Sequence, residues 1–217
     1  SGEDLIHLDE VIAGAYANRT PYVALIKPSC WEPQEPVEIV YPPRESPART
    51  LSLPGYGKPT MKRLDAVRVV AEYADADTII VSNIGVPSKE LYASKDRAGN
   101  FYMLGSYMQA SAIGLGCAVA LPHKRVIVID GDGSLLGSAV LPVVAAAGCS
   151  NLTIAALDNG TFGSTGNQMS PAYATADLGF LALGAGITSV ERVCSADELR
   201  EALDRRTQFV HVLLSPG

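Results

Sequence analysis

The sequence predicts an α/β domain of three layers, in which helices cover both faces of a mostly parallel β-sheet. From residue 61 onward, amphipathic segments of helical period alternate with short apolar runs. The runs at 126–130 and 152–157 are nearly continuous, which indicates strands buried on both faces. Hydrophobic residues make up 47% of the 217 residues and charged residues 18%, a composition that suits a well-buried core.

Two segments precede this domain. Residues 4–18 carry apolar side chains on one helical face, and the apolar run at 21–28 predicts a short buried strand. Residues 31–60 are dense in proline, which disfavours both helix and central strand and predicts an extended linker. We therefore expect three parts: a remnant at 1–30 that is too small to close a domain, the linker at 31–60, and the main domain at 61–217.

Within the main domain, regular elements follow one another closely. We expect helices at 61–74, 134–148 and 195–206, and further helices within the segments 101–122 and 161–186. We expect strands at 77–83, 125–130, 151–159, 188–193 and 208–215, and a short strand at the start of 101–122. The loop at 84–100 is expected to hold no more than one helical turn. Pro142 is expected to kink its helix, and Ser195 with Glu198 predicts a capping box.

The composition disfavours several classes of protein. A net charge of -6 argues against a nucleic-acid or anionic-membrane surface, and no apolar run is long enough to span a membrane. The four cysteines are scattered without close spacing, so we expect small buried side chains rather than a zinc or redox site. With no signal peptide in view, we expect a cytoplasmic protein.

A glycine-rich corner follows the strand at 125–130 and carries an acid in its middle. In Gly131-Asp132-Gly133-Ser134, the glycines and the helix that we expect to begin near Ser134 are typical of a diphosphate cradle. Asp132 would repel a diphosphate unless a divalent cation lay between them. The corner therefore suggests a magnesium site.

Further oxygen ligands are available at the neighbouring strand end. Asn159 offers an amide oxygen and Thr161 a backbone carbonyl, so we predict Mg²⁺ bound by Asp132, Asn159 and Thr161. Taken singly, Asp132 also fits a turn or an N-cap, and Asn159-Gly160 fits a tight turn. Their occurrence at two matching strand ends favours the metal site.

A nicotinamide-binding site is the competing interpretation of the same corner. Gly131 to Gly137 fits a loose G-x-G-x-x-x-G pattern, and Asp158 closes the next strand, where a ribose-binding acid would stand. Asp132 argues against this interpretation because nothing nearby in the sequence would neutralise its charge in a pyrophosphate cradle.

The corner followed by Asp158-Asn159 resembles the cofactor-binding motif of the thiamine-diphosphate-dependent enzymes, although Asp158 stands where the motif usually has asparagine. Segments across about residues 61–217 are most similar to the beta, or pyrophosphate-binding, half of sulfopyruvate decarboxylase, and phosphonopyruvate decarboxylase is a near relative. The segments are NIGVPSKELY, NFYMLGS, ASAIGLGCAVALP, RVIVIDGDGSLL and LDNGTFGSTGNQ. Residues before 31 look like the tail of a pyrimidine-binding half.

The resemblance implies a thiamine-diphosphate-binding fold and a set of residues that contact thiamine diphosphate. These are Asn83, Gly85, Gly105, Ser106, Tyr107, Gly131, Asp132, Gly133, Ser134, Asn159, Thr161 and Gly163. In the family a large apolar side chain after the Gly-Ser pair holds the cofactor bent. Relatives often read Gly-Ser-Met-Gly, whereas this chain reads Gly105-Ser106-Tyr107-Met108, a departure that favours a non-catalytic subunit.

The resemblance also implies a function. A small 2-oxo acid, most readily 3-sulfopyruvate, would lose carbon dioxide to give sulfoacetaldehyde; phosphonopyruvate is the alternative substrate. The family's proton-relay glutamate belongs to the pyrimidine-binding (alpha) half, so the chain is expected to need that partner, to be inactive alone and to form an oligomer. A non-catalytic cofactor-binding or assembly subunit is a further alternative.

Two further groups carry open interpretations. Lys89, Lys95 and Arg97 could meet the sulfonate of the substrate, but solvated surface charge explains them more simply. The run at 163–168 either closes over the substrate or is an ordinary surface loop.

Overall fold

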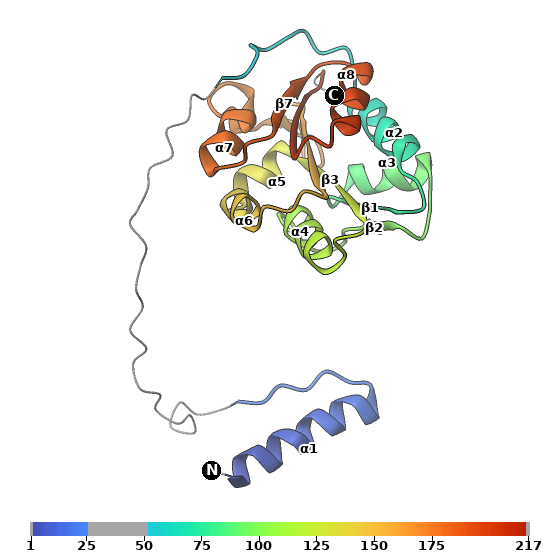
Figure 1. Cartoon of the computed structure of the whole chain (residues 1–217), viewed down its shortest axis with the longest axis vertical. Coiled ribbons are helices and arrows are strands. Elements are labelled where there is room, and N and C mark those ends of the chain that lie inside the picture. Colours follow the sequence, from blue (N-terminus) through green and yellow to red (C-terminus); the bar gives the residue numbers. More distant parts are fainter. Residues whose placement is uncertain (1, 26–51, 216–217) are drawn as a thin grey trace. The chain divides into compact units, whose positions relative to one another are not determined.

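The computed structural model describes residues 2–25 and 52–215, with side chains from residue 7 onward (Figure 1). The chain separates into two compact units, Ser1–Ala48 and Arg49–Gly217. Among the residues described, no helix combines the length and apolar character needed to cross a membrane.

The N-terminal unit contains helix α1 (Gly2–Asn18), which confirms the helix expected at 4–18. The buried strand expected at 21–28 is wrong for its described part, because residues 21–25 form no strand and the side chains of Val23 and Leu25 are 84% and 93% exposed. A strand must pair its backbone groups with a neighbour, and no described strand pairs with this segment. Residues 26–28 lie outside the described part of the chain.

The second unit is built on a six-stranded sheet of order β2-β1-β3-β4-β8-β7, in which all the pairs are parallel. This arrangement confirms the predicted fold class. A short antiparallel pair, β5–β6, stands apart from the sheet. The strands are β1 (Thr78–Ser82), β2 (Asn100–Tyr102), β3 (Arg125–Gly131), β4 (Leu152–Asp158), β5 (Thr161–Phe162), β6 (Gln168–Met169), β7 (Val190–Val193) and β8 (Phe209–Leu213).

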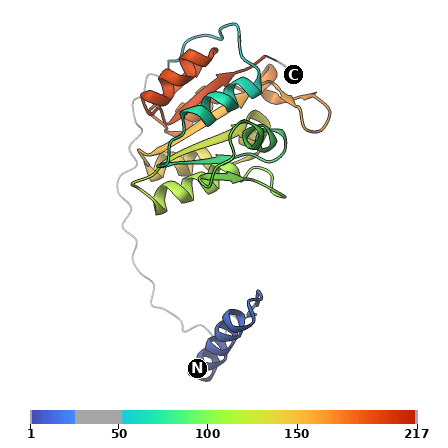
Figure 2. The ribbon, with the colours of Figure 1, turned by 90° about the vertical axis from the view of Figure 1, so that its right-hand side faces the viewer.

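Helices form a layer on each face of this sheet (Figure 2). Side chains of β3 alternate between two apolar cores: Ile127 and Ile129 pack with α2, α3 and α8, whereas Val126 and Val128 pack with α4, α5, α6 and α7. The helices are α2 (Arg63–Tyr73), α3 (Val86–Ser94), α4 (Ala110–Ala120), α5 (Asp132–Gly137), α6 (Val140–Ala147), α7 (Leu178–Ala185) and α8 (Ala196–Asp204).

Two local expectations are corrected. The loop expected at 84–100 contains the nine-residue helix α3, whose Leu91 is fully buried against the core. Pro142 does not kink a helix, because the expected helix is divided before it into α5 and α6. Pro142 lies in the first turn of α6, where a backbone N–H would have had no partner within the helix. The capping box of Ser195 and Glu198 at α8 is confirmed.

At the end of the proline-rich segment, residues 52–60 form no helix or strand, and they are bound to the main domain. The Thr60 N–H donates to the carbonyl of Cys194 at 2.9 Å, and Arg192 donates to the carbonyl of Pro54. The ring of Tyr56 meets that of His211 edge-on, with centroids 5.9 Å apart. Residues 52–60 thus lie on β7 and β8, while 31–51 lie outside the described residues and the linker there stays a prediction.

The packing of α4 on β3 depends on one glycine. A Cβ at the buried Gly114 would clash with Cγ2 of Val128, whereas a Cβ at the exposed Gly116 meets nothing within 4 Å. We expect Gly114→Ala to lower the free energy of unfolding by about 1–3 kcal/mol, and Gly116→Ala to raise it by up to about 1 kcal/mol. Urea titration of both variants measures the difference, and equal effects would contradict this close approach.

Candidate active site at the carboxyl ends of three strands

Three predicted site residues follow three neighbouring parallel strands. Asn83 comes directly after β1, Asp132 after β3 and Asn159 after β4. Ser82 pairs with Ile129 across β1 and β3, and the parallel register continues from β3 to β4. The carboxyl ends of parallel strands meet at one edge of the sheet, where such folds bind ligands. The structure therefore brings these three positions to the same edge.

Asp132 is the first residue of α5, two positions before the expected helix start, and it is only 4% exposed. The hydroxyl of Ser170 donates to its Oδ2. Burial raises the pKa of Asp132, and the nearby carboxylate of Asp158 raises it further, while the Ser170 hydrogen bond opposes both effects. A cation at this edge would offset the burial and the repulsion together.

A second buried carboxylate, Asp130, lies on β3 one position before the strand ends at Gly131. It accepts hydrogen bonds from the Ser111 hydroxyl at 2.6 Å and from the Gly131 N–H at 3.0 Å. Burial raises its pKa, and these two donors lower it in part. With Asp132 and Asp158, this side chain makes the edge acidic, which favours a cation over a bare phosphate.

Asn159 and Thr161 lie in a tight turn after β4. The Gly160 N–H donates to Asp158 Oδ1 at 2.9 Å, and Gly160 has a φ of +68°, which glycine adopts without strain. Asn159 Oδ1 accepts from the Thr161 N–H at 3.3 Å, and Asn159 Nδ2 donates to Thr161 Oγ1 at 3.0 Å. The amide oxygen keeps a second lone pair, so the turn leaves it able to bind a metal.

The glycines of the corner let other side chains approach closely. A Cβ at Gly133 would lie 2.7 Å from Cδ1 of Phe162 and 3.1 Å from the Tyr107 hydroxyl. A Cβ at Gly131 would meet only Asn83 Nδ2, at 3.5 Å. The corner therefore touches β5 on one side and the loop after β1 on the other.

Tyr107 and Met108 lie against the same corner. Burial raises the pKa of Tyr107, and the charges of Asp132 and Asp130 raise it further. Met108 has a φ of +67°, the left-handed conformation that glycine adopts most readily, and its side chain covers Gly137. The methionine thus keeps a glycine-like backbone and fills the space over α5.

The remaining predicted residues lie in more open positions. A Cβ at Gly85, the N-cap of α3, would lie 3.0 Å from Ser164 Oγ, so the loop after β1 meets the run at 163–168. Gly163 is exposed. Gly105, with a φ of +73°, is also exposed and Ser106 is half-buried. A Cβ at Gly105 would meet nothing within 4 Å, and the pair joins the corner along the chain through Tyr107.

Sequence reasoning missed Ser170 and an ion pair at the same edge. Arg63 forms a bidentate pair with Glu90, at 2.9 and 3.0 Å, and its Nη1 would lie 3.4 Å from a Cβ at Gly163. No local motif marks these side chains, because each reaches its partner across distant parts of the sequence.

The basic residues suggested for the sulfonate are arranged differently. Lys95 Nζ donates to the Ala74 carbonyl at 3.2 Å, and Arg97 donates to the carbonyl of Asp75. Both carbonyls precede β1, at the opposite edge of the sheet from the corner. Lys89 is exposed on α3, so surface and structural roles account for all three cations.

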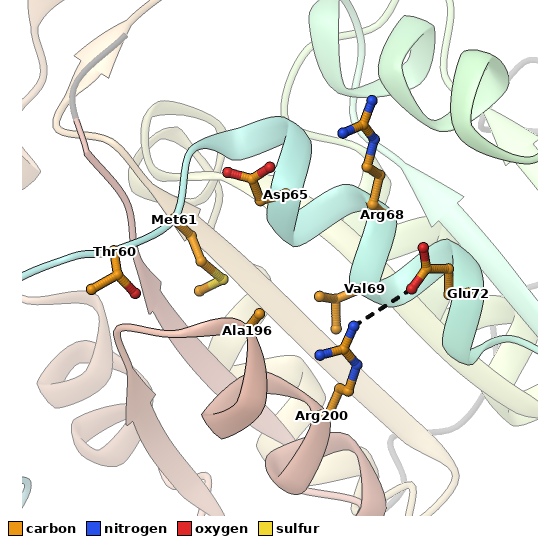
Figure 3. A pocket seen from close by; sticks show the side chains of 8 residues that line it. All are labelled: Thr60, Met61, Asp65, Arg68, Val69, Glu72, Ala196 and Arg200. Carbon is orange, nitrogen blue, oxygen red and sulfur yellow. Dashed lines mark ion pairs between the residues drawn. The ribbon is translucent and has the colours of Figure 1, made fainter.

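A pocket of about 330 Å³ opens between α2 and α8 and contains none of the predicted site residues (Figure 3). Arg200 and Glu72 form an ion pair across it at 3.5 Å. Within the described ranges, no group of three or more His, Cys, Asp or Glu residues could hold a metal. The magnesium set predicted from sequence has a single carboxylate and would not form such a group.

A family model described as the thiamine pyrophosphate enzyme C-terminal TPP-binding domain matches residues 89–213, more than half of the chain. The chain belongs to the thiamine pyrophosphate enzyme family. The predicted thiamine-diphosphate-binding fold is thereby confirmed, and the nicotinamide interpretation of the glycine pattern loses its support.

Relatives of this family member are named decarboxylases. The chain is 41% identical to sulfopyruvate decarboxylase of Methanosarcina acetivorans over 99% of its own length and 58% of the relative's. It is 46% identical to the sulfopyruvate decarboxylase subunit beta of Methanocaldococcus jannaschii, over 59% of this chain and 69% of that subunit. Phosphonopyruvate decarboxylase of Streptomyces viridochromogenes is 37% identical over 76% of this chain and 42% of its own length. The chain thus spans little more than half of the Methanosarcina relative.

Solved structures support the fold of this thiamine pyrophosphate enzyme domain. A 4-hydroxybenzoylformate decarboxylase of Rhodococcus jostii, described as thiamine diphosphate-dependent, matches with a TM-score of 0.60 at 19% identity, over 82% of this chain and 36% of that one. A putative thiamin diphosphate-dependent enzyme of Mycobacterium smegmatis matches with a TM-score of 0.59 at 20% identity, over 81% and 36%.

The corner of this thiamine pyrophosphate domain fits the family's cofactor. Ser134 Oγ is buried and makes no hydrogen bond of good geometry to a described residue, although its hydroxyl is close enough to Asp130 to lower the pKa of that carboxyl. A buried hydroxyl without a partner costs about 1–3 kcal/mol, and a phosphate oxygen would accept its hydrogen bond. Gly131, before Asp132, leaves the backbone open to close approach, because a Cβ there would meet only Asn83 Nδ2 at 3.5 Å.

Proposed function

We propose that the chain is the thiamine diphosphate- and Mg²⁺-binding half of a 2-oxo acid decarboxylase that converts 3-sulfopyruvate to sulfoacetaldehyde and carbon dioxide. The observation that carries the proposal is the buried Asp132 in a diphosphate-type corner beside the Asn159 turn. Its 41–46% identity to proteins named sulfopyruvate decarboxylase supports the choice of substrate.

The proposed metal ligands are Asp132 Oδ, Asn159 Oδ1 and the Thr161 carbonyl. Together they offer one negative charge and two neutral oxygens, a hard set that suits Mg²⁺ bridged to phosphate oxygens. Ser170 holds the Asp132 carboxylate in place through its hydroxyl. Ligand carboxylates are commonly oriented by such hydrogen bonds.

The proposed diphosphate contacts are Gly131, Gly133 and Ser134, with Asn83 and Gly85 at the far end and Gly163 beyond the turn. Ser134 supplies a hydroxyl that makes no hydrogen bond of good geometry to a described residue, and Asn83 Nδ2 lies next to Gly131. These groups are neutral donors. They can therefore bind the diphosphate beside the acidic edge once the metal has offset the charge of Asp132.

The remaining proposed contacts orient the organic part of the cofactor. When bound, thiamine diphosphate supplies the electron sink that makes loss of carbon dioxide from a 2-oxo acid possible. Gly105 and Ser106 would contact its aminopyrimidine, and Tyr107, 45% exposed next to Gly133, would support its bend. The protein's contribution is orientation and the exclusion of water from the substrate carboxylate.

The proposal includes a partner that carries the pyrimidine-binding half and its glutamate. Several relatives are named subunit beta, and the chain covers 69–84% of three of them. An assembly of both halves, and hence an oligomer, is therefore the proposed active form. The N-terminal segment at 1–30, attached by the linker, would be the tail of such a half.

Two alternatives have observations in their favour. Phosphonopyruvate decarboxylases are 37% and 39% identical to the chain, which overlaps the 38–46% identity of the sulfopyruvate enzymes. A non-catalytic cofactor-binding subunit is favoured by Met108, whose side chain fills space over Gly137 that a glycine would leave open.

Reconstitution tests the proposed function. The chain alone, with thiamine diphosphate and Mg²⁺, is expected to release no carbon dioxide from 3-sulfopyruvate, and adding a sulfopyruvate decarboxylase alpha subunit is expected to start release. Phosphonopyruvate, at the same concentration, should react more slowly. Turnover by the chain alone would contradict the need for a partner. No turnover by the assembled pair, with cofactor bound, would favour the non-catalytic alternative.

A further inference from the structure

His211 lies wholly inside the domain, between polar groups rather than in an apolar core. Its side chain is 0% exposed, and its Nε2 lies 2.8 Å from Asp158 Oδ2. Its Nδ1 lies 3.4 Å from Nε of Arg192, directly across the β7–β8 pair. Burying so many polar groups is costly unless each finds a partner, so the arrangement calls for a reason.

The neighbours of His211 determine its hydrogen-bonding pattern. The Arg192 guanidinium can only donate, so Nδ1 of His211 is the acceptor in that contact. Nε2 then carries the hydrogen and donates to Asp158. Arg192 is held in turn by an ion pair with Asp177, by the Pro54 carbonyl and by the ring of Tyr56, 4.5 Å below it.

Asp158 connects His211 to the Asn159–Gly160 turn of the proposed metal site. Its Oδ2 faces His211 while its Oδ1 accepts the Gly160 N–H at 2.9 Å. The Gly160 carbonyl accepts the Ser170 N–H at 2.9 Å, and the Ser170 hydroxyl donates to Asp132. These hydrogen bonds therefore run from the imidazole through Gly160 and Ser170 to Asp132, and Asn159 directly precedes Gly160 in the turn.

We propose that His211 is a positioning residue: through Asp158 it fixes the Asn159–Gly160 turn and so presents Asn159 and Thr161 to the metal. The role in metal binding rests on the proposed function, whereas the fixing of the turn rests on the structure alone. This role also gives a reason for the aspartate at position 158, because one carboxylate oxygen accepts from the imidazole and the other from the Gly160 N–H. Tyr56 and Pro54 hold the far end of the network, so the end of the proline-rich segment contributes to the order of the site.

Three variants separate this role from simple packing. His211→Leu removes the donor to Asp158 at similar size, whereas His211→Gln keeps an N–H near the Nε2 position. Val212→Ala is the matched control, because Val212 is equally buried on β8 but packs into the opposite core. If His211→Leu does not fold, His211→Asn replaces it. The asparagine amide reaches only the position of Nδ1, so this variant also lacks the Nε2 donor to Asp158.

The first readout is amide exchange of Gly160 in the metal-free chain, measured by NMR relative to the Ile154 amide within β4. We expect Gly160 to exchange about tenfold faster in His211→Leu, as loss of one hydrogen bond implies, and the ratio to stay near that of the unsubstituted chain in His211→Gln and Val212→Ala. An unchanged ratio in His211→Leu, or an equal change in Val212→Ala, would overturn the proposal.

The second readout is Mg²⁺-dependent binding of thiamine diphosphate, measured with the alpha subunit present. We expect about tenfold weaker binding in His211→Leu, the usual effect of removing an outer contact of a metal ligand, with recovery in His211→Gln. Equal binding by His211→Leu and the unsubstituted protein would overturn the link to the metal. If the unsubstituted protein binds no cofactor while Gly160 exchange responds as expected, the proposed function fails and the role of His211 in the turn stands.

Discussion

Replacing Asp132 by alanine is expected to abolish Mg²⁺-dependent binding of thiamine diphosphate. Removing an outer contact of a metal ligand commonly costs 10- to 100-fold in affinity, so losing a ligand should cost more than about 100-fold. Calorimetric titration with the alpha subunit present measures this loss. Asp204→Ala is the control, because Asp204 is an exposed acid at the end of α8. If the two variants bound the cofactor equally well, Asp132 would not be a ligand.

Asp132→Ala is expected to stabilise the metal-free chain at neutral pH, although it abolishes cofactor binding. Burial and Asp158 raise the pKa of Asp132 in the folded chain, so its ionised form disfavours folding. The metal-free protein should lose stability as the pH rises from 3.8, the ordinary value, through the raised folded pKa, and Asp132→Ala should lack that loss. Thermal unfolding between pH 4 and 7 measures it, with chelator present. The stability of Asp132→Ala relative to the unsubstituted chain should rise from pH 4 to pH 7, because the effect of Asp130, with its own raised pKa, is common to both. A fall in this relative stability would contradict the sign.

Alanine at the two glycines of the corner is expected to separate packing from binding. In Gly133→Ala the new Cβ would clash with the Phe162 ring, and we expect a loss of about 1–3 kcal/mol in the free energy of unfolding. In Gly131→Ala the Cβ lies 3.5 Å from Asn83 Nδ2, an ordinary contact, so the metal-free stability should change little. That methyl group would nevertheless stand where the diphosphate approaches, and we expect binding to weaken about tenfold, or ~1.4 kcal/mol.

Urea unfolding and cofactor titration of both variants test this separation. Loss of stability in Gly131→Ala as large as that in Gly133→Ala would contradict the packing of the corner. Unchanged cofactor affinity in Gly131→Ala would place the diphosphate elsewhere.

Sequence reasoning predicted the edge of the sheet well because the relevant residues adjoin strands. Asp132 and Asn159 each follow an apolar run directly, and parallel strands bring their carboxyl ends together. The helix α3 was missed because its pattern is weak. The strand expected at 21–28 was wrong for the described residues 21–25, because an apolar run does not show whether a partner strand exists. The apolar pattern of the sequence thus marked most segments of regular structure, but it did not identify the helix at 86–94 or show that residues 21–25 form no strand.

The residues that support the site were beyond sequence reasoning. Ser170 lies 38 positions from Asp132, directly after the β5–β6 pair. His211 lies within the strand expected at 208–215, but its partner Asp158 lies 53 positions away. Arg63 and Glu90 similarly meet between α2 and α3. A single sequence carries no local signal for such contacts.

The central claim is that the acid of the corner holds a metal for thiamine diphosphate. Calorimetric titration of the chain, assembled with the alpha subunit, with thiamine diphosphate in Mg²⁺ and then in chelator tests it most directly. We predict binding that requires Mg²⁺ and no comparable binding of NAD. Thiamine diphosphate binding that chelator leaves unchanged, or tight metal-independent binding of NAD, would contradict the claim.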